Sequence, residues 1–211
     1  MRRKAIIIGT GGHSRVLLSL LTAIGKHEML GIVDFVEPNV DEVIMGVPVI
    51  GSIACLEVFR GRKDLDVFLG IGDNALRRIW WQNVGNLDLA LPNLISPYAI
   101  VDPNAHLGHA NVVCARAFIG PEAVLGDNNL VNTAAVLEHE IHIGSHCHLA
   151  PSSTVSGRSQ IGDECFIGAG ATVINYIEVV ADTIIGAGAT VVRSITESGV
   201  YVGTPAKKVG L

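Results

Sequence analysis

A histidine between two acids, Glu138-His139-Glu140, is the part of the sequence best suited to catalysis. A carboxylate beside an imidazole orients its tautomer and raises its basicity, as a general base requires. A solvated histidine between two exposed acids is the alternative, and it stays open on these residues alone. The choice depends on the structural element that carries His139 and on what that element places beside the imidazole.

Two glycine-rich stretches have the character of anion-binding turns. Gly9-Thr10-Gly11-Gly12-His13-Ser14 stands between an apolar run, 4–8, and a helix-periodic segment, 15–24. The second stretch, 70–74, also follows an apolar run and precedes a helix-periodic segment. A strand–glycine–helix unit points backbone N–H groups toward a phosphate. Because Ser14 replaces the third glycine of a dinucleotide fingerprint, a tight turn without a ligand is the alternative.

The element that carries His139 is a six-residue repeat. From Val101 to Val191 every sixth residue is aliphatic, over sixteen positions without a slip or an insertion. The residue four places later is mostly Ala, Ser or Cys. A period of six fits neither a helix nor a two-residue strand alternation, and it is the signature of a parallel β-helix. We expect each hexad to form a strand and a turn, with glycine or asparagine supplying the positive φ of the corner.

This repeat predicts which residues stack. Three hexads close one triangular coil, so residues 18 apart lie on the same face, ~4.8 Å from each other. Gly157 is 18 residues after His139, so its backbone N–H should lie near the imidazole and stabilise an oxyanion there. No two of the eight histidines are 18 apart, which argues against a metal site within one chain. A metal site shared between chains, as in γ-class carbonic anhydrases, is the alternative.

The first 90 residues predict an element of another kind. A second apolar run, 30–33, ends in Asp34, 25 residues after Gly9. An acid at such a position after a glycine turn is typical of nucleotide-binding βαβ units. We therefore expect a small Rossmann-like α/β domain in residues 1–90 and the β-helix in residues 91–211.

Composition excludes several functional classes. The 211 residues carry a net charge of −5, and no long run has one sign, so neither nucleic-acid binding nor polybasic membrane binding is expected. The four cysteines form no CxxC pair, which favours reduced thiols in the cytoplasm. No apolar run reaches 18 residues and no signal-peptide pattern opens the chain, so we expect no membrane segment.

The motifs occur together and in a fixed order: the glycine loop 9–13, Gly72-Asp73-Asn74, the hexads, the run 132–140 and the run 202–207. In this combination the chain resembles the sugar O-acyltransferase family of sialic acid O-acetyltransferase NeuD. Within that family it is most similar to the PglD-like nucleotide amino-sugar N-acetyltransferases. The resemblance covers essentially the whole chain. It implies a left-handed β-helix, acetyl-CoA as cosubstrate, and a homotrimer with its site between neighbouring prisms.

The resemblance also implies roles for individual residues. His139 corresponds to the general base, and Glu140 to the acid that tunes it. Residues that correspond to nucleotide-sugar contacts are Gly11, Gly12, His13, Asp34, Phe35 and Gly72. Residues that correspond to acetyl-CoA contacts are His148, Gly157, Ala169 and Ala187. Lys207 and Lys208 either meet the phosphates of coenzyme A or are solvated, and no residue corresponds to a metal ligand.

The reaction implied is direct acetyl transfer to the 4-amino group of a UDP- or GDP-linked amino-deoxysugar, in cytoplasmic glycan or lipopolysaccharide biosynthesis. In relatives a second acid often follows the residue equivalent to Asp34, whereas Phe35 stands here, so the nucleotide preference stays open. Three alternatives to this function remain. They are O-acetylation of a sialic-acid-like sugar, a γ-carbonic-anhydrase-like metalloenzyme, and a non-catalytic prism that serves as a scaffold or sensor. The Glu-His-Glu run argues against the scaffold.

Overall fold

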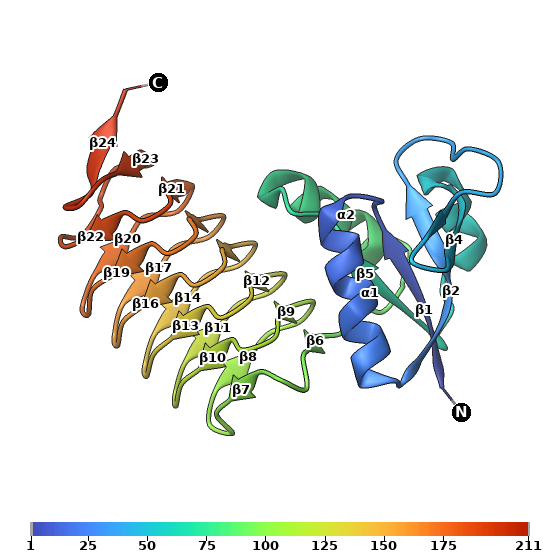
Figure 1. The fold of residues 1–211 in the computed structure, drawn as a ribbon, viewed down its shortest axis with the longest axis horizontal. Coiled ribbons are helices and arrows are strands. Elements are labelled where there is room, and N and C mark those ends of the chain that lie inside the picture. The colour runs from blue at the N-terminus through green and yellow to red at the C-terminus, as the bar shows by residue number, and fades with distance from the viewer. Residues whose placement is uncertain (1, 211) are drawn as a thin grey trace. The chain divides into compact units, whose positions relative to one another are not determined.

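The computed structural model describes residues 2–210. The chain forms two compact units, Met1–Leu94 and Ile95–Leu211. The first unit is an α/β domain and the second is a triangular prism of short strands (Figure 1).

A mostly parallel five-stranded sheet forms the N-terminal unit, with strand order β3-β4-β2-β1-β5. Strand β1 lies between two neighbours and pairs in parallel with β2 on one side and with β5 on the other. The β1 residues 5–8 are fully buried, as expected for a parallel strand covered on both faces. The strands are β1 (Arg3–Ile8), β2 (His27–Asp34), β3 (Val43–Ile44), β4 (Val47–Ser52) and β5 (Leu65–Leu69).

Two α-helices follow the strands that carry the glycine turns. These are α1 (Gly12–Ile24) after β1 and α2 (Asn74–Asn86) after β5, and a 3-10 helix, η1 (Ile53–Phe59), follows β4. The sequence predicted the two α-helices but started α1 at residue 15. The apolar periodicity marks only the turns that pack on the sheet, whereas the first turn begins with Gly12 and His13. Each α-helix has 13 residues, and no helix in the described chain has the length and apolarity needed to cross a bilayer.

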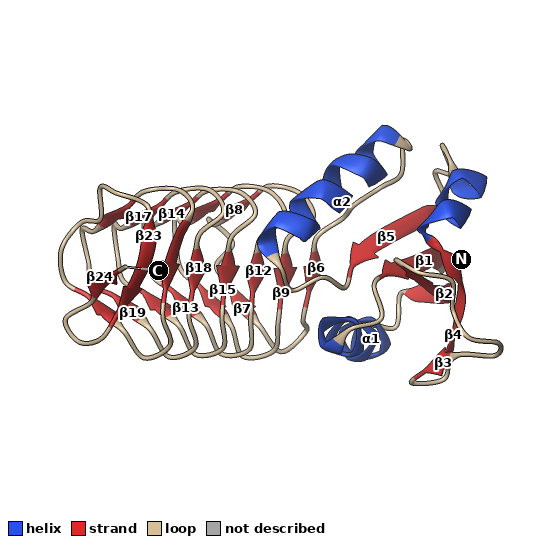
Figure 2. Ribbon diagram, turned by 90° about the horizontal axis from the view of Figure 1, so that it is seen from above, coloured by secondary structure: helices blue, strands red, loops and turns tan. Residues whose placement is uncertain are grey.

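The prism consists of three sheets (Figure 2), in which the parallel strands from β7 to β22 recur every 18 residues. We call them face 1 (β7 to β22), face 2 (β8 to β20) and face 3 (β6 to β24). The face 1 strands are β7 (Ile100–Val101), β10 (Phe118–Ile119), β13 (Val136–Leu137), β16 (Thr154–Val155), β19 (Thr172–Val173) and β22 (Thr190–Val191). The face 2 strands are β8 (His106–Leu107), β11 (Val124–Leu125), β14 (His142–Ile143), β17 (Gln160–Ile161) and β20 (Glu178–Val179). The face 3 strands are β6 (Leu94–Ile95), β9 (Val112–Val113), β12 (Leu130–Val131), β15 (His148–Leu149), β18 (Phe166–Ile167), β21 (Thr183–Ile185), β23 (Gly199–Val202) and β24 (Lys207–Val209).

The strand pairing confirms the parallel β-helix predicted from the six-residue repeat. Every parallel pair from β7 to β22 joins residues 18 apart, such as Leu137 and Val155. The aliphatic residue and the small residue of the hexads fill one continuous core, in which Leu137, Val155 and Ala135 are fully buried. The antiparallel β23–β24 pair was not predicted, because it lies beyond the last hexad.

The prediction that glycine or asparagine supplies the positive φ of each corner was wrong for most corners. The corner residues with positive φ are mostly not glycine, and Glu140 (56°), Arg158 (60°) and Tyr176 (61°) are examples. The glycine that follows the aliphatic residue has no such φ, but a Cβ there would collide with the next coil. At Gly162 it would lie 2.5 Å from the backbone nitrogen of Ala181. At the position after the aliphatic residue, glycine is therefore needed for the close approach of successive coils, whereas Gly170 (66°) and Gly188 (67°) do adopt the left-handed φ of a corner.

Candidate active site

His139 lies at the corner where the chain passes from face 1 to face 2. Its side chain is 49% exposed, and its Nδ1 lies 2.9 Å from Oε2 of Glu140. Because an ionised carboxylate only accepts hydrogen bonds, Nδ1 carries the proton in this pair. The lone pair of Nε2 is then free to accept a proton from a substrate.

Glu140 is held ionised by two neighbours. The Nε of Arg158 donates to Oε2 at 2.8 Å, the same oxygen that accepts from His139. The hydrogen bond from Arg158, followed by that from His139, lowers the pKa of Glu140 below its ordinary value. The carboxylate therefore keeps its charge in weakly acidic solution, and His139 keeps the tautomer described above.

Gly157 packs directly against the imidazole. It is buried, and a Cβ added there would lie 2.6 Å from both Cε1 and Nε2 of His139. In the same turn, the backbone N–H of Arg158 donates to the carbonyl oxygen of His139 at 3.1 Å. Only glycine leaves room for the ring, so the Nε2 edge of the base faces bare backbone.

Of the four acetyl-CoA residues proposed from the sequence, Gly157 lies beside His139 and the other three lie elsewhere on the prism. His148 is on face 3, where its Nε2 is 3.2 Å from Nδ2 of Asn132 and its ring meets the Phe166 ring edge-on at 5.0 Å. Ala169 and Ala187 are exposed at the corner between face 3 and face 1. They stack one coil apart, since the N–H of Gly188 donates to the Ala169 carbonyl at 2.9 Å.

These positions divide the site residues into two groups. His139 and Gly157 occupy the corner opposite face 3, whereas His148 belongs to face 3 itself. One prism therefore does not bring His148, Ala169 or Ala187 beside the base. The residues predicted for the site therefore form two separate groups on the prism of one chain.

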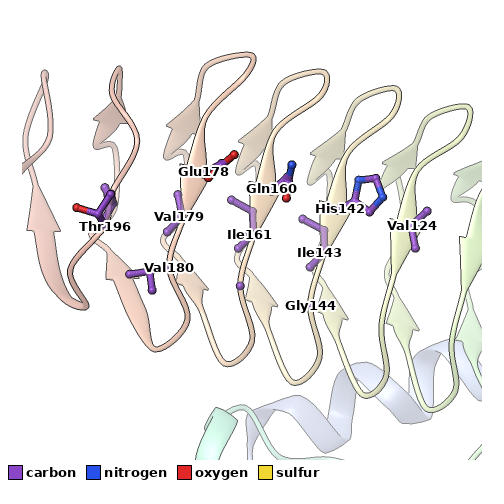
Figure 3. A pocket seen from close by; sticks show the side chains of 12 residues that line it. Val124, His142, Ile143, Gly144, Gln160, Ile161, Glu178, Val179, Val180 and Thr196 are labelled. Carbon is purple, nitrogen blue, oxygen red and sulfur yellow. The ribbon is translucent and has the colours of Figure 1, made fainter.

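A shallow hollow of about 600 Å³ lies on face 2, beyond the His139 corner (Figure 3). Its outward side chains form a row at 18-residue intervals: Val124, His142, Gln160 and Glu178. The row contains one histidine, and His148 lies in a different sheet. Among residues 2–210, no three His, Cys, Asp or Glu side chains are grouped so that they would hold a metal ion.

In the N-terminal unit the two glycine turns meet at the carboxyl ends of β1 and β5. Buried Ser14 donates to the carbonyl oxygen of Gly9 at 2.6 Å and lies 3.2 Å from that of Gly70. A Cβ on Gly70 would lie 2.0 Å from Oγ of Ser14. Ser14 therefore joins the two turns at the point where chain topology changes direction, which is where open α/β sheets bind ligands.

Three of the predicted binding glycines face open space. A Cβ at Gly11, Gly12 or Gly72 would meet no atom within 4 Å. Gly11 caps α1 without any side-chain hydrogen bond, whereas Asp73 caps α2 by accepting from the N–H of Leu76 at 2.8 Å. The N–H groups that open α1, where His13 lies in the first turn, are thus the ones offered to an anion.

Asp34 lies at the end of β2, close to the first glycine turn. Its Oδ2 accepts from the hydroxyl of Thr10 and its Oδ1 from the N–H of Phe35, both at 2.8 Å. These bonds fix the carboxylate and leave further lone pairs on each oxygen. The Phe35 ring packs against Trp80 of α2, with 5.7 Å between ring centroids.

The two tail lysines lie on β24. Lys208 forms an ion pair with Glu197 at 2.6 Å, and Lys207 is exposed.

The sequence analysis did not identify Arg158 and Tyr176. These residues follow Glu140 at intervals of 18 residues, and Arg158 contacts both Glu140 and Tyr176. The signal was present, because the rule that selected Gly157 from His139 also selects Arg158 from Glu140.

Comparisons with known proteins agree with this architecture. The PglD N-terminal domain family matches residues 4–84. The acetyltransferase domain of PglB from Neisseria gonorrhoeae FA1090 is 35% identical, with a TM-score of 0.91, and the match covers 99% of this chain and 100% of that one. PerB from Caulobacter crescentus, solved with CoA and GDP-perosamine, is 38% identical with a TM-score of 0.91 over 98% of this chain and 97% of that one. A search of the curated proteins gives no match.

A second structure of the same PglB domain contains acetyl coenzyme A. It is 34% identical, with a TM-score of 0.91, over 99% of this chain and 100% of that one. The predicted fold class, a left-handed parallel β-helix preceded by a Rossmann-like α/β domain, is confirmed by these likenesses together with the strand pairing.

Proposed function

Because the chain belongs to the PglD-like family of sugar N-acetyltransferases and is an acetyl-CoA-dependent enzyme, we propose that its acceptor is the 4-amino group of a nucleotide-linked amino-deoxysugar. The complex of PerB with CoA and GDP-perosamine supports a nucleotide amino-sugar as substrate. The observation in this chain that supports it most is the placement of His139 between the Glu140 carboxylate and the bare backbone of Gly157.

His139 acts as the general base in this proposal. Its Nδ1 donates to Glu140 at 2.9 Å, so Nε2 takes a proton from the sugar amine as the nitrogen attacks. Acetyl-CoA supplies the thioester carbon, to which the new C–N bond forms while the C–S bond breaks. Direct transfer needs no covalent enzyme intermediate, and the proton held by His139 is available to the departing thiolate.

Gly157 contributes its backbone N–H. A donor beside Nε2 is well placed to stabilise negative charge that develops on the carbonyl oxygen during attack. The absence of a side chain is what lets the imidazole and the carbonyl approach this donor together, since a Cβ would reach within 2.6 Å of the ring. Ala169 and Ala187 leave an unobstructed strip for the pantetheine arm, with His148 on the neighbouring face.

The N-terminal unit, residues 1–90 in our sequence-based division, binds the nucleotide-sugar. Gly11, Gly12 and His13 at the uncapped start of α1 would hold the diphosphate. Gly72 lies beyond β5, and Ser14 fixes the two turns relative to each other. Asp34 accepts from a ribose or base donor, and Phe35 with Trp80 offers an aromatic surface nearby.

We further propose that the enzyme is a homotrimer. Residues of face 3 and of the His139 corner cannot meet within one prism, so a neighbouring copy must complete the site. Apolar side chains point outward on two faces, including Ile100 on face 1, which is 65% exposed, and Ile184 on face 3, which is 44% exposed. Burial of such rows between copies would supply the hydrophobic contribution to assembly.

We place the reaction in cytoplasmic glycan or lipopolysaccharide biosynthesis. The four cysteines are free, which fits a reducing compartment. In this setting the enzyme would take a soluble nucleotide-sugar as substrate and release its N-acetylated form as product.

The test is an acetyl-transfer assay that follows release of the coenzyme A thiol. The acceptor panel contains UDP- and GDP-linked 4-amino-sugars, their N-acetylated forms and free sialic acids. We expect turnover only with the free amino-sugars, and a loss of about 10²–10⁴-fold in turnover for His139→Ala. Turnover of free sialic acids alone, or full activity of His139→Ala, would refute the proposal.

A further inference from the structure

The corner that carries Glu140 continues as a column of side chains in successive coils. Glu122, Glu140, Arg158 and Tyr176 follow each other at intervals of 18 residues, and each has a positive φ. Arg158 bridges two members of this column, because its Nε donates to Glu140 Oε2 at 2.8 Å and its Nη1 donates to the hydroxyl of Tyr176 at 2.7 Å. The guanidinium also lies 5.7 Å from the centroid of the Tyr176 ring.

Arg158 and the base compete for one oxygen atom. Oε2 of Glu140 accepts from Arg158 at 2.8 Å and from Nδ1 of His139 at 2.9 Å. A carboxylate shared with a fixed cation stabilises an imidazolium less than one that faces the imidazole alone. Arg158 is therefore linked to His139 through the Glu140 oxygen that Nδ1 contacts.

Several titratable residues lie next to His139 in the sequence or at the same corner of the prism. Glu138 precedes His139 in the chain, Glu140 contacts it, and Glu122 occupies the same corner one coil earlier. His142 follows on face 2, and Tyr176 is the remaining titratable group of the column. The Glu140 carboxylate, in contact with Nδ1, favours the protonated form of the imidazole, which cannot act as a base. The guanidinium of Arg158 opposes this effect from the next coil.

We propose that Arg158, restrained by Tyr176, is a positioning residue that fixes the Glu140 carboxylate and keeps His139 unprotonated in weakly acidic solution. This inference rests on the proposed role of His139 as the general base. The tether to Tyr176 matters because Arg158 is 49% exposed, and a long exposed side chain otherwise loses most of an ion pair's benefit to its own flexibility.

The pKa of Glu140 agrees with this arrangement. The hydrogen bond from Arg158 is the largest influence that lowers it, ahead of the hydrogen bond from His139. Loss of Arg158 would remove a positive charge beside the His139–Glu140 pair and leave the carboxylate's charge undivided on the imidazole. This favours the protonated ring at a higher pH than in the parent enzyme.

The experiment compares pH profiles of kcat/KM for the full-length parent and Arg158→Gln. We expect the acidic limb of Arg158→Gln to move to higher pH by on the order of 0.5–1 pH unit, as the removal of one charge near a partly exposed group implies. Well below the limb, the rate should fall by about 3- to 10-fold relative to the parent, and above it the two enzymes should differ little.

Three further variants make the result specific. Arg158→Lys keeps the charge and should keep the limb near that of the parent, and Tyr176→Phe should shift it in the same direction as Arg158→Gln but by less. Arg62→Gln removes a partly buried arginine that pairs with Asp64 at 2.9 Å in the other unit, and it should shift nothing. A shift with Arg62→Gln equal to that with Arg158→Gln would show a general charge effect and would overturn the proposal.

Titration of the His139 ring by NMR separates this inference from the proposed function. The resonance is assigned by its loss in His139→Ala, and its midpoint should rise in Arg158→Gln whether or not the protein is assayed as an enzyme. An unchanged midpoint overturns the role of Arg158. If the midpoint rises but His139→Ala retains full activity, the proposed function fails while the coupling stands. If Arg158→Gln changes only KM for the nucleotide-sugar, Arg158 contacts substrate and is not a positioning residue.

Discussion

Replacement of Gly157 by Ala should disable the base without unfolding the prism. The new Cβ would lie 2.6 Å from Nε2 and Cε1 of His139, whereas unstrained contacts between such atoms are about 3.5 Å. Since Gly157 has no left-handed φ, the methyl group causes no backbone strain. The exposed imidazole should therefore give way by about 1 Å. Displacement of a catalytic group by that distance costs about 10²-fold in rate, which is the loss in kcat that we expect.

The assay is steady-state acetyl transfer, with thermal unfolding measured in parallel. Gly85→Ala in α2 is the control, because nothing lies within 4 Å of its added Cβ, and it should keep full activity. If Gly157 acts through His139, the double variant with His139→Ala should be no slower than His139→Ala alone. A folded Gly157→Ala enzyme with unchanged kcat would refute the argument that the working base lies against Gly157.

The remaining predictions concern charge, nucleotide binding and assembly. Glu140→Gln removes the negative charge that stabilises imidazolium, so the acidic limb of its pH–rate profile should move to lower pH and its plateau should fall; movement to higher pH would contradict this sign. Gly12→Val fills the open space at the start of α1, so calorimetry should show weaker binding of a nucleoside diphosphate, and unchanged affinity would mean that the loop is only a turn. Sedimentation should show a trimer at micromolar protein, and a fully active monomer would contradict the shared site.

The prism was predictable because its rule is periodic. An aliphatic residue at every sixth position specifies which residues point inward, and the 18-residue offset then places Gly157 beside His139. The same offset places Arg158 beside Glu140, but the offset alone does not show that the guanidinium contacts the carboxylate. The Arg158–Tyr176 contact depends on two long side chains meeting at an exposed corner, and no pattern of hydrophobicity encodes that.

The structural roles of the glycines were harder to predict from the sequence than the positions of the buried aliphatic residues. At Gly162 glycine avoids a collision with the next coil, at Gly157 it makes room for the imidazole, and at Gly12 it borders open space. The sequence shows the same letter in all three places, so a single conformational explanation was bound to fail for some. The role of Ser14 as a link between two turns was hidden for a similar reason, because Gly9 and Gly70 meet only when β1 and β5 pair.

The position of the new acetyl group tests the central claim most directly. The product of a reaction with a nucleotide-linked 4-amino-sugar is isolated and treated with mild alkali, and its mass is then measured. Transfer to nitrogen gives an amide, which survives this treatment with the acetyl group in place, and that is the result we predict. Loss of the acetyl group would reveal an ester, contradict N-acetylation and identify the enzyme as an O-acetyltransferase.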